Sequence, residues 1–151
     1  MGMVLLMVIG GSPGSTAGGM KTTTAAVLFA MAISVFRKNE QAHLYNRRIA
    51  EETQRNAATI FVLYMMLFTG SAMFISYLEK VPLVTAFFET GSAIGTVGLS
   101  LGLTPTLGLA SRLVLICLMF FGRVGGLTLI FATVSGKRTE YKYPQEKINV
   151  G

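Results

Sequence analysis

The stretch FFETGSAIGTVGLS, residues 87–100, decides the fold because it has the composition of a membrane pore loop. Its core of Thr96, Val97 and Gly98, followed by Leu99, is typical of a potassium filter. In such filters an extended backbone turns successive carbonyl oxygens toward the pore axis, where they replace the water shell of the cation. Glycine allows backbone angles that are closed to other residues. Because the same tripeptide is common in buried helices and strands, its surroundings carry the prediction.

The composition of the chain is typical of a membrane protein. Of its 151 residues, 52% are hydrophobic and 13% are charged, and its acidic residues are seven Glu and no Asp. A soluble domain has more charge. The net charge of +6 is compatible with nucleic-acid binding, but the basic residues gather in two polar segments that flank apolar ones. That pattern is typical of cytoplasmic membrane loops, so we expect a lipid environment and no nucleic-acid partner.

Two apolar stretches predict full membrane crossings. Residues 57–78 contain no charge, and at ~1.5 Å per residue they are long enough to cross a hydrocarbon core of about 30 Å. Residues 106–135 form the second predicted helix, interrupted only by Arg112 and Arg123. Both crossings are therefore expected to be α-helical.

The basic segments predict the topology. The loop 37–56 and the tail 136–151 are both rich in Lys and Arg, so the positive-inside rule places both in the cytoplasm. An even number of crossings must then separate them. We therefore expect residues 82–105 to be re-entrant, with a short pore helix followed by the filter, and not to form a third span.

The re-entrant segment contains one carboxylate. Pro82 is a good first residue for a helix, and residues 83–93 are apolar except for Glu89, which predicts about 12 residues or ~18 Å of helix. The glycines that follow make a continued helix unfavourable, and irregular backbone at membrane depth must be buried in protein or line a watery cavity. We expect Glu89 to support the filter by accepting backbone hydrogen bonds or by pairing with a cation; exposure at the outer mouth is the alternative.

The N-terminal segment predicts a broken transmembrane helix. Residues 1–36 are apolar apart from Lys21, yet a continuous helix of that length would extend ~54 Å, longer than the membrane core. An intramembrane loop that faces protein or water should interrupt it. The loop consists of Gly10, Gly11, Ser12, Pro13, Gly14, Ser15, Thr16, Ala17, Gly18 and Gly19. A phosphate-binding loop is excluded because Met20 separates Gly19 from Lys21.

Two cations lie inside apolar stretches. A charge at membrane depth costs roughly 2.5–3.5 kcal/mol on insertion scales, so Lys21 and Arg123 need water, an acidic partner or carbonyl oxygens. Each could also extend to the interface. The functional alternative is that they form an electrostatic barrier in the ion path and help to gate it.

Four stretches together resemble the C-terminal part of the membrane subunit of Ktr-type potassium transporters, in the Trk/Ktr/HKT superfamily. They are GGSPGSTAGGMKTTT, FETGSAIGTVGLSLGLTP, FFGRVGGLTL and YPQEKINVG. The resemblance implies an all-α membrane protein with four helix, pore-loop, helix repeats around a pseudo-fourfold pore. Residues 1–36 would be the second helix of the third repeat, and residues 57–135 the fourth repeat.

The resemblance also implies residue roles. Thr96, Val97, Gly98 and Leu99 would form one quarter of the filter. The loop of residues 10–19 with Lys21 would be the gate, and Arg123 would be the cation that faces it. The sequence departs from the family pattern at Ala17, where glycine is usual, and the extra side chain would stiffen the loop slightly.

The resemblance implies partners as well. The full-length membrane subunit forms a homodimer in the bacterial inner membrane and docks on a cytosolic ring of nucleotide-binding RCK (KTN) subunits. The loop 37–56 and the tail 136–151 are the surfaces available for it. Residues 44, 45, 49 and 53 have near-helical spacing, which is compatible with a short amphipathic helix or with a plain connector.

We therefore expect passive, potassium-selective transport with no cofactor and no metal beyond the transported ion. An enzyme is disfavoured because one His, one Cys and no Asp supply neither a metal cluster nor a nucleophile with a base. Two alternatives remain. One is a tetrameric potassium channel with one pore loop per chain, disfavoured by Leu99 and Ser100 where Tyr and Gly would follow. The other is a non-conducting structural subunit whose glycines serve helix packing.

Overall fold

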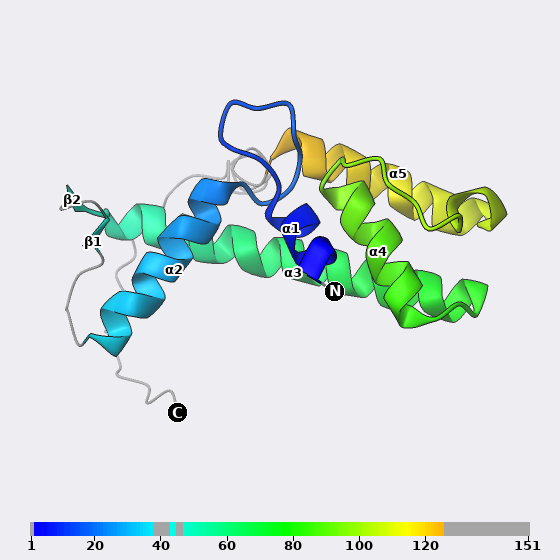
Figure 1. Cartoon of the computed structure of the whole chain (residues 1–151), viewed down its shortest axis with the longest axis horizontal. Coiled ribbons are helices and arrows are strands. Elements are labelled where there is room, and N and C mark those ends of the chain that lie inside the picture. The colour runs from blue at the N-terminus through cyan, green and yellow to red at the C-terminus, as the bar shows by residue number, and fades with distance from the viewer. Residues whose placement is uncertain (1, 38–42, 45–46, 126–151) are drawn as a thin grey trace, which may run out of the picture.

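A computed structural model describes residues 2–37, 43–44 and 47–125 of the chain (Figure 1). Its elements are almost entirely helical, as expected. In chain order they are α1 (Gly2–Ile9), α2 (Thr22–Phe36), β1 (His43–Leu44), β2 (Arg47–Arg48), α3 (Glu51–Glu79), α4 (Leu83–Ile94), the 3₁₀ helix η1 (Thr104–Thr106) and α5 (Leu109–Val124). The tail 136–151, predicted to be cytoplasmic, lies outside the described residues.

A loop of residues 10–21, called loop 10–21 below, separates α1 from α2. It lies in the glycine-rich part of the sequence, where the interruption was expected. Gly10 and Gly19 have φ of 74° and 88°, in the left-handed region that favours glycine. The two ends of the loop also meet closely, because a Cβ atom on Gly10 would overlap the carbonyl oxygen of Gly18.

The long helix α3 begins at Glu51, six residues before the predicted span of residues 57–78. Glu51 and Glu52 occupy its first turn, where carboxylates interact favourably with the helix dipole. The charges that marked the expected membrane boundary therefore belong to the same helix as the apolar span. Between α2 and α3, the described residues contain two antiparallel strands of two residues each, β1 and β2. An amphipathic helix or a plain connector was considered for this part of the chain.

The segment predicted to be a pore loop runs from α4 through η1 to α5. α4 ends at Ile94, and residues 95–103 follow without regular secondary structure. α5 begins at Leu109, three residues after the predicted start at residue 106, because residues 104–106 form η1 and Gly108 is the extended N-cap. It ends at Val124, followed by Gly125 with φ of 84°. The predicted continuation of this helix from residue 126 to 135 lies outside the described residues.

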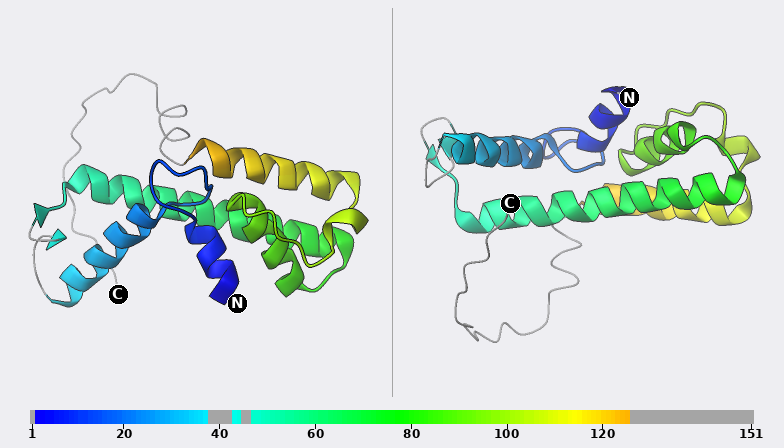
Figure 2. Two further views of the ribbon diagram at one scale, coloured as in Figure 1. Left: turned by 45° about the horizontal axis from the view of Figure 1, so that its top comes forward. Right: turned by 90° about the horizontal axis from the view of Figure 1, so that it is seen from below.

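The helices form two layers, which Figure 2 shows from the side. α3 and α5 lie side by side, and α1, α2 and α4 cover them. α4 packs against α1, α3 and α5, while α2 packs against α3. The core lies where α4 meets its neighbours, and among its fully buried side chains are Tyr64, Ile75, Ile94 and Leu118.

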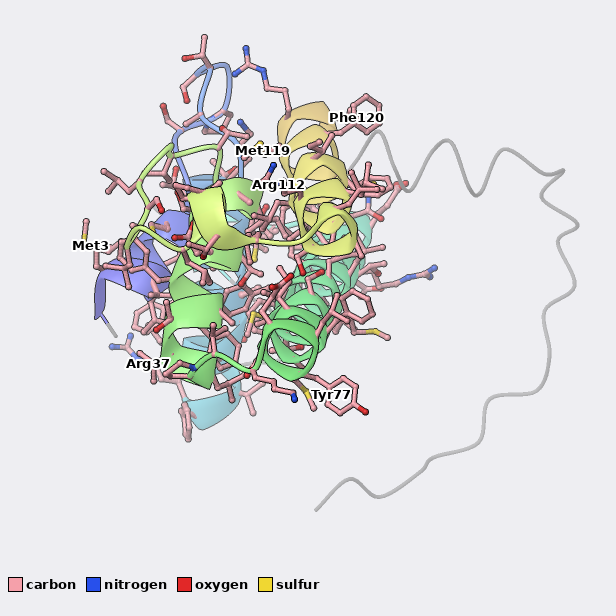
Figure 3. The ribbon with its side chains drawn as sticks, turned by 90° about the vertical axis from the view of Figure 1, so that its right-hand side faces the viewer. Met3, Arg37, Tyr77, Arg112, Met119 and Phe120 are labelled. Carbon is pink, nitrogen blue, oxygen red and sulfur yellow. The ribbon has the colours of Figure 1, made fainter. Side chains whose placement is uncertain are left out.

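Among the described helices, α3 alone is long and apolar enough to cross a membrane, with a mean hydropathy of 1.9 in its most apolar window. Only 28% of that window is buried inside the structure. Large apolar side chains therefore project outward, as Figure 3 shows for Tyr77 of α3 and Phe120 of α5, which are 86% and 63% exposed. Such a surface suits lipid or further helices and does not suit water.

The contact between α4 and α5 should depend on Gly122. A Cβ atom there would overlap the carbonyl oxygen of Ile94 and lie 2.8 Å from its carbonyl carbon. We expect Gly122→Ala to lower the melting temperature of the detergent-purified protein, since overpacking costs typically about 1–3 kcal/mol. Gly70→Ala is the matched control, because a Cβ atom on Gly70 in α3 meets nothing within 4 Å. Equal melting temperatures for the two variants would contradict the close packing.

Candidate functional site

Residues 96–99, called the candidate filter segment below, turn back over the C-terminal end of α4. Three of their backbone amides are bound by that helix end. The amide of Thr96 donates to the carbonyl oxygen of Ala93 at 3.0 Å, and that of Val97 to the carbonyl oxygen of Ser92 at 2.9 Å. The amide of Leu99 donates to the hydroxyl of Ser92, also at 2.9 Å.

The carbonyl oxygens of the candidate filter segment, unlike its amides, are not bound by the end of α4. No residue in the described ranges donates a hydrogen bond to any of the four. Val97, Gly98 and Leu99 are exposed, so these unpaired oxygens are accessible to water or to a cation. The C-terminal end of α4 also carries partial negative charge, which favours a cation nearby.

Two residues of the segment have left-handed backbone. Thr96 has φ of 51° and Gly98 has φ of 82°. The conformation suits Gly98, whereas for a β-branched residue such as Thr96 it is an outlier that the surroundings must hold in place. A Cβ atom on Gly98 would meet nothing within 4 Å, so the requirement for glycine there is conformational and does not come from crowding.

Glu89 lies on α4 behind the candidate filter segment and is 3% exposed. It accepts three hydrogen bonds, from the hydroxyl of Ser100 at 2.6 Å, the amide of Leu101 at 3.0 Å and the hydroxyl of Thr104 at 2.8 Å. All three donors belong to the segment that leaves the candidate filter. The carboxylate therefore fastens this outgoing segment to α4, and a desolvated carboxylate needs this number of donors.

Loop 10–21 also contacts the candidate filter segment. The amide of Gly18 donates to the hydroxyl oxygen of Thr96 at 2.8 Å. The guanidinium of Arg123, at the end of α5, donates to the carbonyl oxygen of Thr16. The ammonium of Lys21 donates to the carbonyl oxygen of Ala17 at 2.6 Å. Both cations thus use loop carbonyls, one of the three kinds of partner considered for them.

Residues 12–16 form the exposed tip of the loop, whereas the glycines at its two ends are half-buried or buried. Gly19 is buried and Gly11 is half-buried, whereas residues 12–16, which include Ser12, Pro13, Gly14 and Ser15, are exposed. The hydroxyl of Ser15 accepts a hydrogen bond from the amide of Ala17 at 3.1 Å. The tip is therefore stabilised mainly by its own turn.

Sequence reasoning missed the contribution of Glu79. This last residue of α3 accepts hydrogen bonds from the amide of Gly108 at 2.9 Å and from the hydroxyl of Ser111 at 2.6 Å, at the start of α5. An acidic residue at a helix C-terminus is unfavourable for its own helix dipole. This unfavourable position could have indicated that Glu79 interacts with another helix. Its carboxylate stabilises the N-terminal end of α5.

Comparison with known proteins gives a consistent family. The model of a family described as TrkH, cation transport protein, matches residues 1–141. The chain is 41% identical over 155 residues to the potassium/sodium uptake protein NtpJ of Enterococcus hirae, an alignment that covers 98% of this chain and 34% of that protein. It is 33% identical over 148 residues to the Ktr system potassium uptake protein B of Bacillus subtilis, covering 98% and 33%. The chain spans about a third of the length of these relatives.

The carboxylate of Glu89 should be tested by Glu89→Gln. The amide side chain keeps the shape but offers only one acceptor oxygen in place of two, so at least one of the three donors loses its acceptor. We expect a loss of about 1–3 kcal/mol in the free energy of unfolding, measured by denaturant titration in detergent. Glu51→Gln, at an exposed position in the first turn of α3, should cost less than about 1 kcal/mol. Equal losses would exclude a supporting role for Glu89.

Proposed function

Because the chain belongs to the TrkH family of cation transport proteins, we propose that it forms one part of a potassium-selective pore that conducts passively across a cell membrane. One observation carries the proposal. The amides of residues 96, 97 and 99 are bound by the end of α4, while the four carbonyl oxygens of the segment accept no hydrogen bond from the described residues. Carbonyl oxygens free of protein partners are what a potassium filter presents to the ion. Thr96, Val97, Gly98 and Leu99 would thus supply one quarter of the filter.

We further propose that loop 10–21 is the gate of this pore. Its contact with Thr96 supports this proposal, because a loop next to the candidate filter segment would obstruct ion flow through it. The two cations that donate to its carbonyls, Lys21 and Arg123, would add an electrostatic barrier for a potassium ion. Movement of the loop away from the segment would open the path.

The topology and the partners belong to the same proposal. The protein would lie in the bacterial inner membrane with loop 37–56 and the C-terminus in the cytoplasm, and residues 57–135 would be the last of four repeats. The full-length membrane subunit would form a homodimer under the control of a cytosolic RCK ring. In support, two relatives are named as components of a Ktr system, and the basic residues gather in the proposed cytoplasmic segments.

Potassium uptake tests the proposal directly. We expect no uptake from the 151 residues alone in Bacillus subtilis that lacks its potassium uptake membrane proteins but retains the rest of its Ktr system. Uptake should appear when the chain replaces the matching third of the Ktr system potassium uptake protein B; we call this hybrid the fusion. Uptake by the chain alone would indicate a self-assembling channel, and a silent fusion that is present in the membrane would contradict the proposed transport function.

The filter assignment can be tested with two glycines of the same conformation. Gly98 and Gly102 have φ of 82° and 86°, and a Cβ atom on either meets nothing within 4 Å. A left-handed conformation costs a non-glycine residue roughly 1–2 kcal/mol, so each serine variant carries the same local strain. We expect Gly98→Ser in the fusion to reduce the preference for potassium over sodium about tenfold, whereas Gly102→Ser should leave it nearly unchanged. Equal ion preference in the two variants would place the filter elsewhere.

A further inference from the structure

The side chain of Thr96 connects two segments that are far apart in the sequence. Its hydroxyl oxygen accepts the hydrogen bond from the Gly18 amide at 2.8 Å, across 78 residues. Gly18 is buried and Thr96 is half-buried. In a potassium filter only the carbonyl of this residue need face the ion, so the proposed ion coordination does not account for the hydroxyl contact.

The contact is tight enough to exclude any side chain at residue 18. A Cβ atom on Gly18 would lie 2.8 Å from both the Cγ2 and the Oγ1 atoms of Thr96, and 3.0 Å from the carbonyl oxygen of Gly122. Loop 10–21, the candidate filter segment and α5 therefore meet at one point. Only glycine lets the loop backbone approach the Thr96 side chain and the Gly122 carbonyl oxygen this closely.

Few other bonds hold the middle of the loop. Its ends are fixed by the amide of Met20, which donates to Val8, and by the amide of Thr22, which donates to Gly11. Between those ends, the hydrogen bonds of the described residues to other parts of the chain are those from Gly18 to Thr96 and from Arg123 to Thr16. Loss of the Thr96 bond would therefore leave the loop attached to the rest of the molecule mainly through one exposed arginine.

We propose that Thr96 is the positioning residue that holds loop 10–21 against the candidate filter segment, so that the loop position and the filter conformation change together. The physical link is the backbone of Thr96. Because its φ of 51° is sterically strained, relaxation to an ordinary conformation would turn its carbonyl and move its hydroxyl away from Gly18. This inference rests on the proposed function only in treating residues 96–99 as the filter and the loop as the gate.

Hydrogen–deuterium exchange in the purified fusion tests the coupling without requiring transport. Thr96→Ala removes the hydroxyl, and Thr96→Ser keeps it. We expect Thr96→Ala to accelerate exchange at the amides of Gly18, Met20 and Thr22 by about 2- to 10-fold, since a hydrogen bond contributes about 0.5–1.5 kcal/mol. Thr96→Ser should restore the slow exchange. Acceleration confined to Gly18, or equal acceleration in both variants, would overturn the proposal, because the bond would then be local.

A double-mutant cycle tests the same hydrogen bond with a substitution on its loop side. Gly18→Ala should accelerate exchange at Met20 and Thr22 when Thr96 is present, because the added methyl group meets the Thr96 side chain. The effect should shrink by at least half in the Thr96→Ala background, where both clashing atoms are absent. Additive effects of the two substitutions would show that they act independently, and would reject the coupling even if one variant were poorly folded.

Rubidium leak through the resting fusion separates the proposed transport function from the proposed coupling between Thr96 and loop 10–21. We expect Thr96→Ala to raise the leak about 2- to 10-fold and Thr96→Ser to leave it low. A fusion that exchanges as predicted but never conducts would retain the coupling and reject the proposed transport. A fusion that conducts, with exchange in Thr96→Ala identical to that of the unsubstituted fusion, would retain the transport and reject the coupling.

Discussion

Close contacts at three glycines around the C-terminal end of α4 are the constraint on which the rest of the structure depends. Gly95 lies against the backbone carbonyl of Met7 in α1, Gly122 of α5 against that of Ile94, and Gly18 of loop 10–21 against the side chain of Thr96. At each point a Cβ atom would overlap a neighbour or come within 2.8 Å of it. Because these contacts are this close, the end of the short helix is fixed from three sides, and the segment that leaves it can hold the strained left-handed conformation of Thr96.

Two carboxylates support the segment that leads from the end of α4 to the start of α5. Glu89 fastens residues 100–104 to α4, and Glu79 fastens the start of α5 to the end of α3. Each uses its oxygens for uncharged donors of the chain. The irregular backbone between α4 and α5 is therefore supported by side-chain oxygens where no secondary structure supplies hydrogen bonds.

Local signals in the sequence predicted the local structure well. Pro82 and the glycines after Ile94 indicated a short helix that ends near the filter motif, and the glycine-rich stretch indicated where the N-terminal apolar segment is interrupted. The start of α3 at Glu51 was missed because charges were used to mark span ends, although carboxylates in a first turn also favour a helix. The bond from Gly18 to Thr96 was beyond reach, since it joins residues 78 positions apart and leaves no periodic pattern. The approach of Arg123 to the loop, across 107 positions, was expected only from the resemblance to Ktr-type subunits. Membership of the TrkH family, in contrast, could be read from four short stretches.

The separation of Gly18 from Thr96 has a consequence for biosynthesis. A ribosome adds about 5–20 residues per second, so the 78 residues between the two partners correspond to roughly 4–16 seconds of translation. During this interval the amide of Gly18 has no Thr96 to bind, and the carbonyl of Thr16 waits still longer for Arg123. The glycine-rich loop must therefore remain hydrated or be shielded by the insertion machinery until α5 has been synthesised. Assembly of this region thus waits for a segment made well after the loop itself.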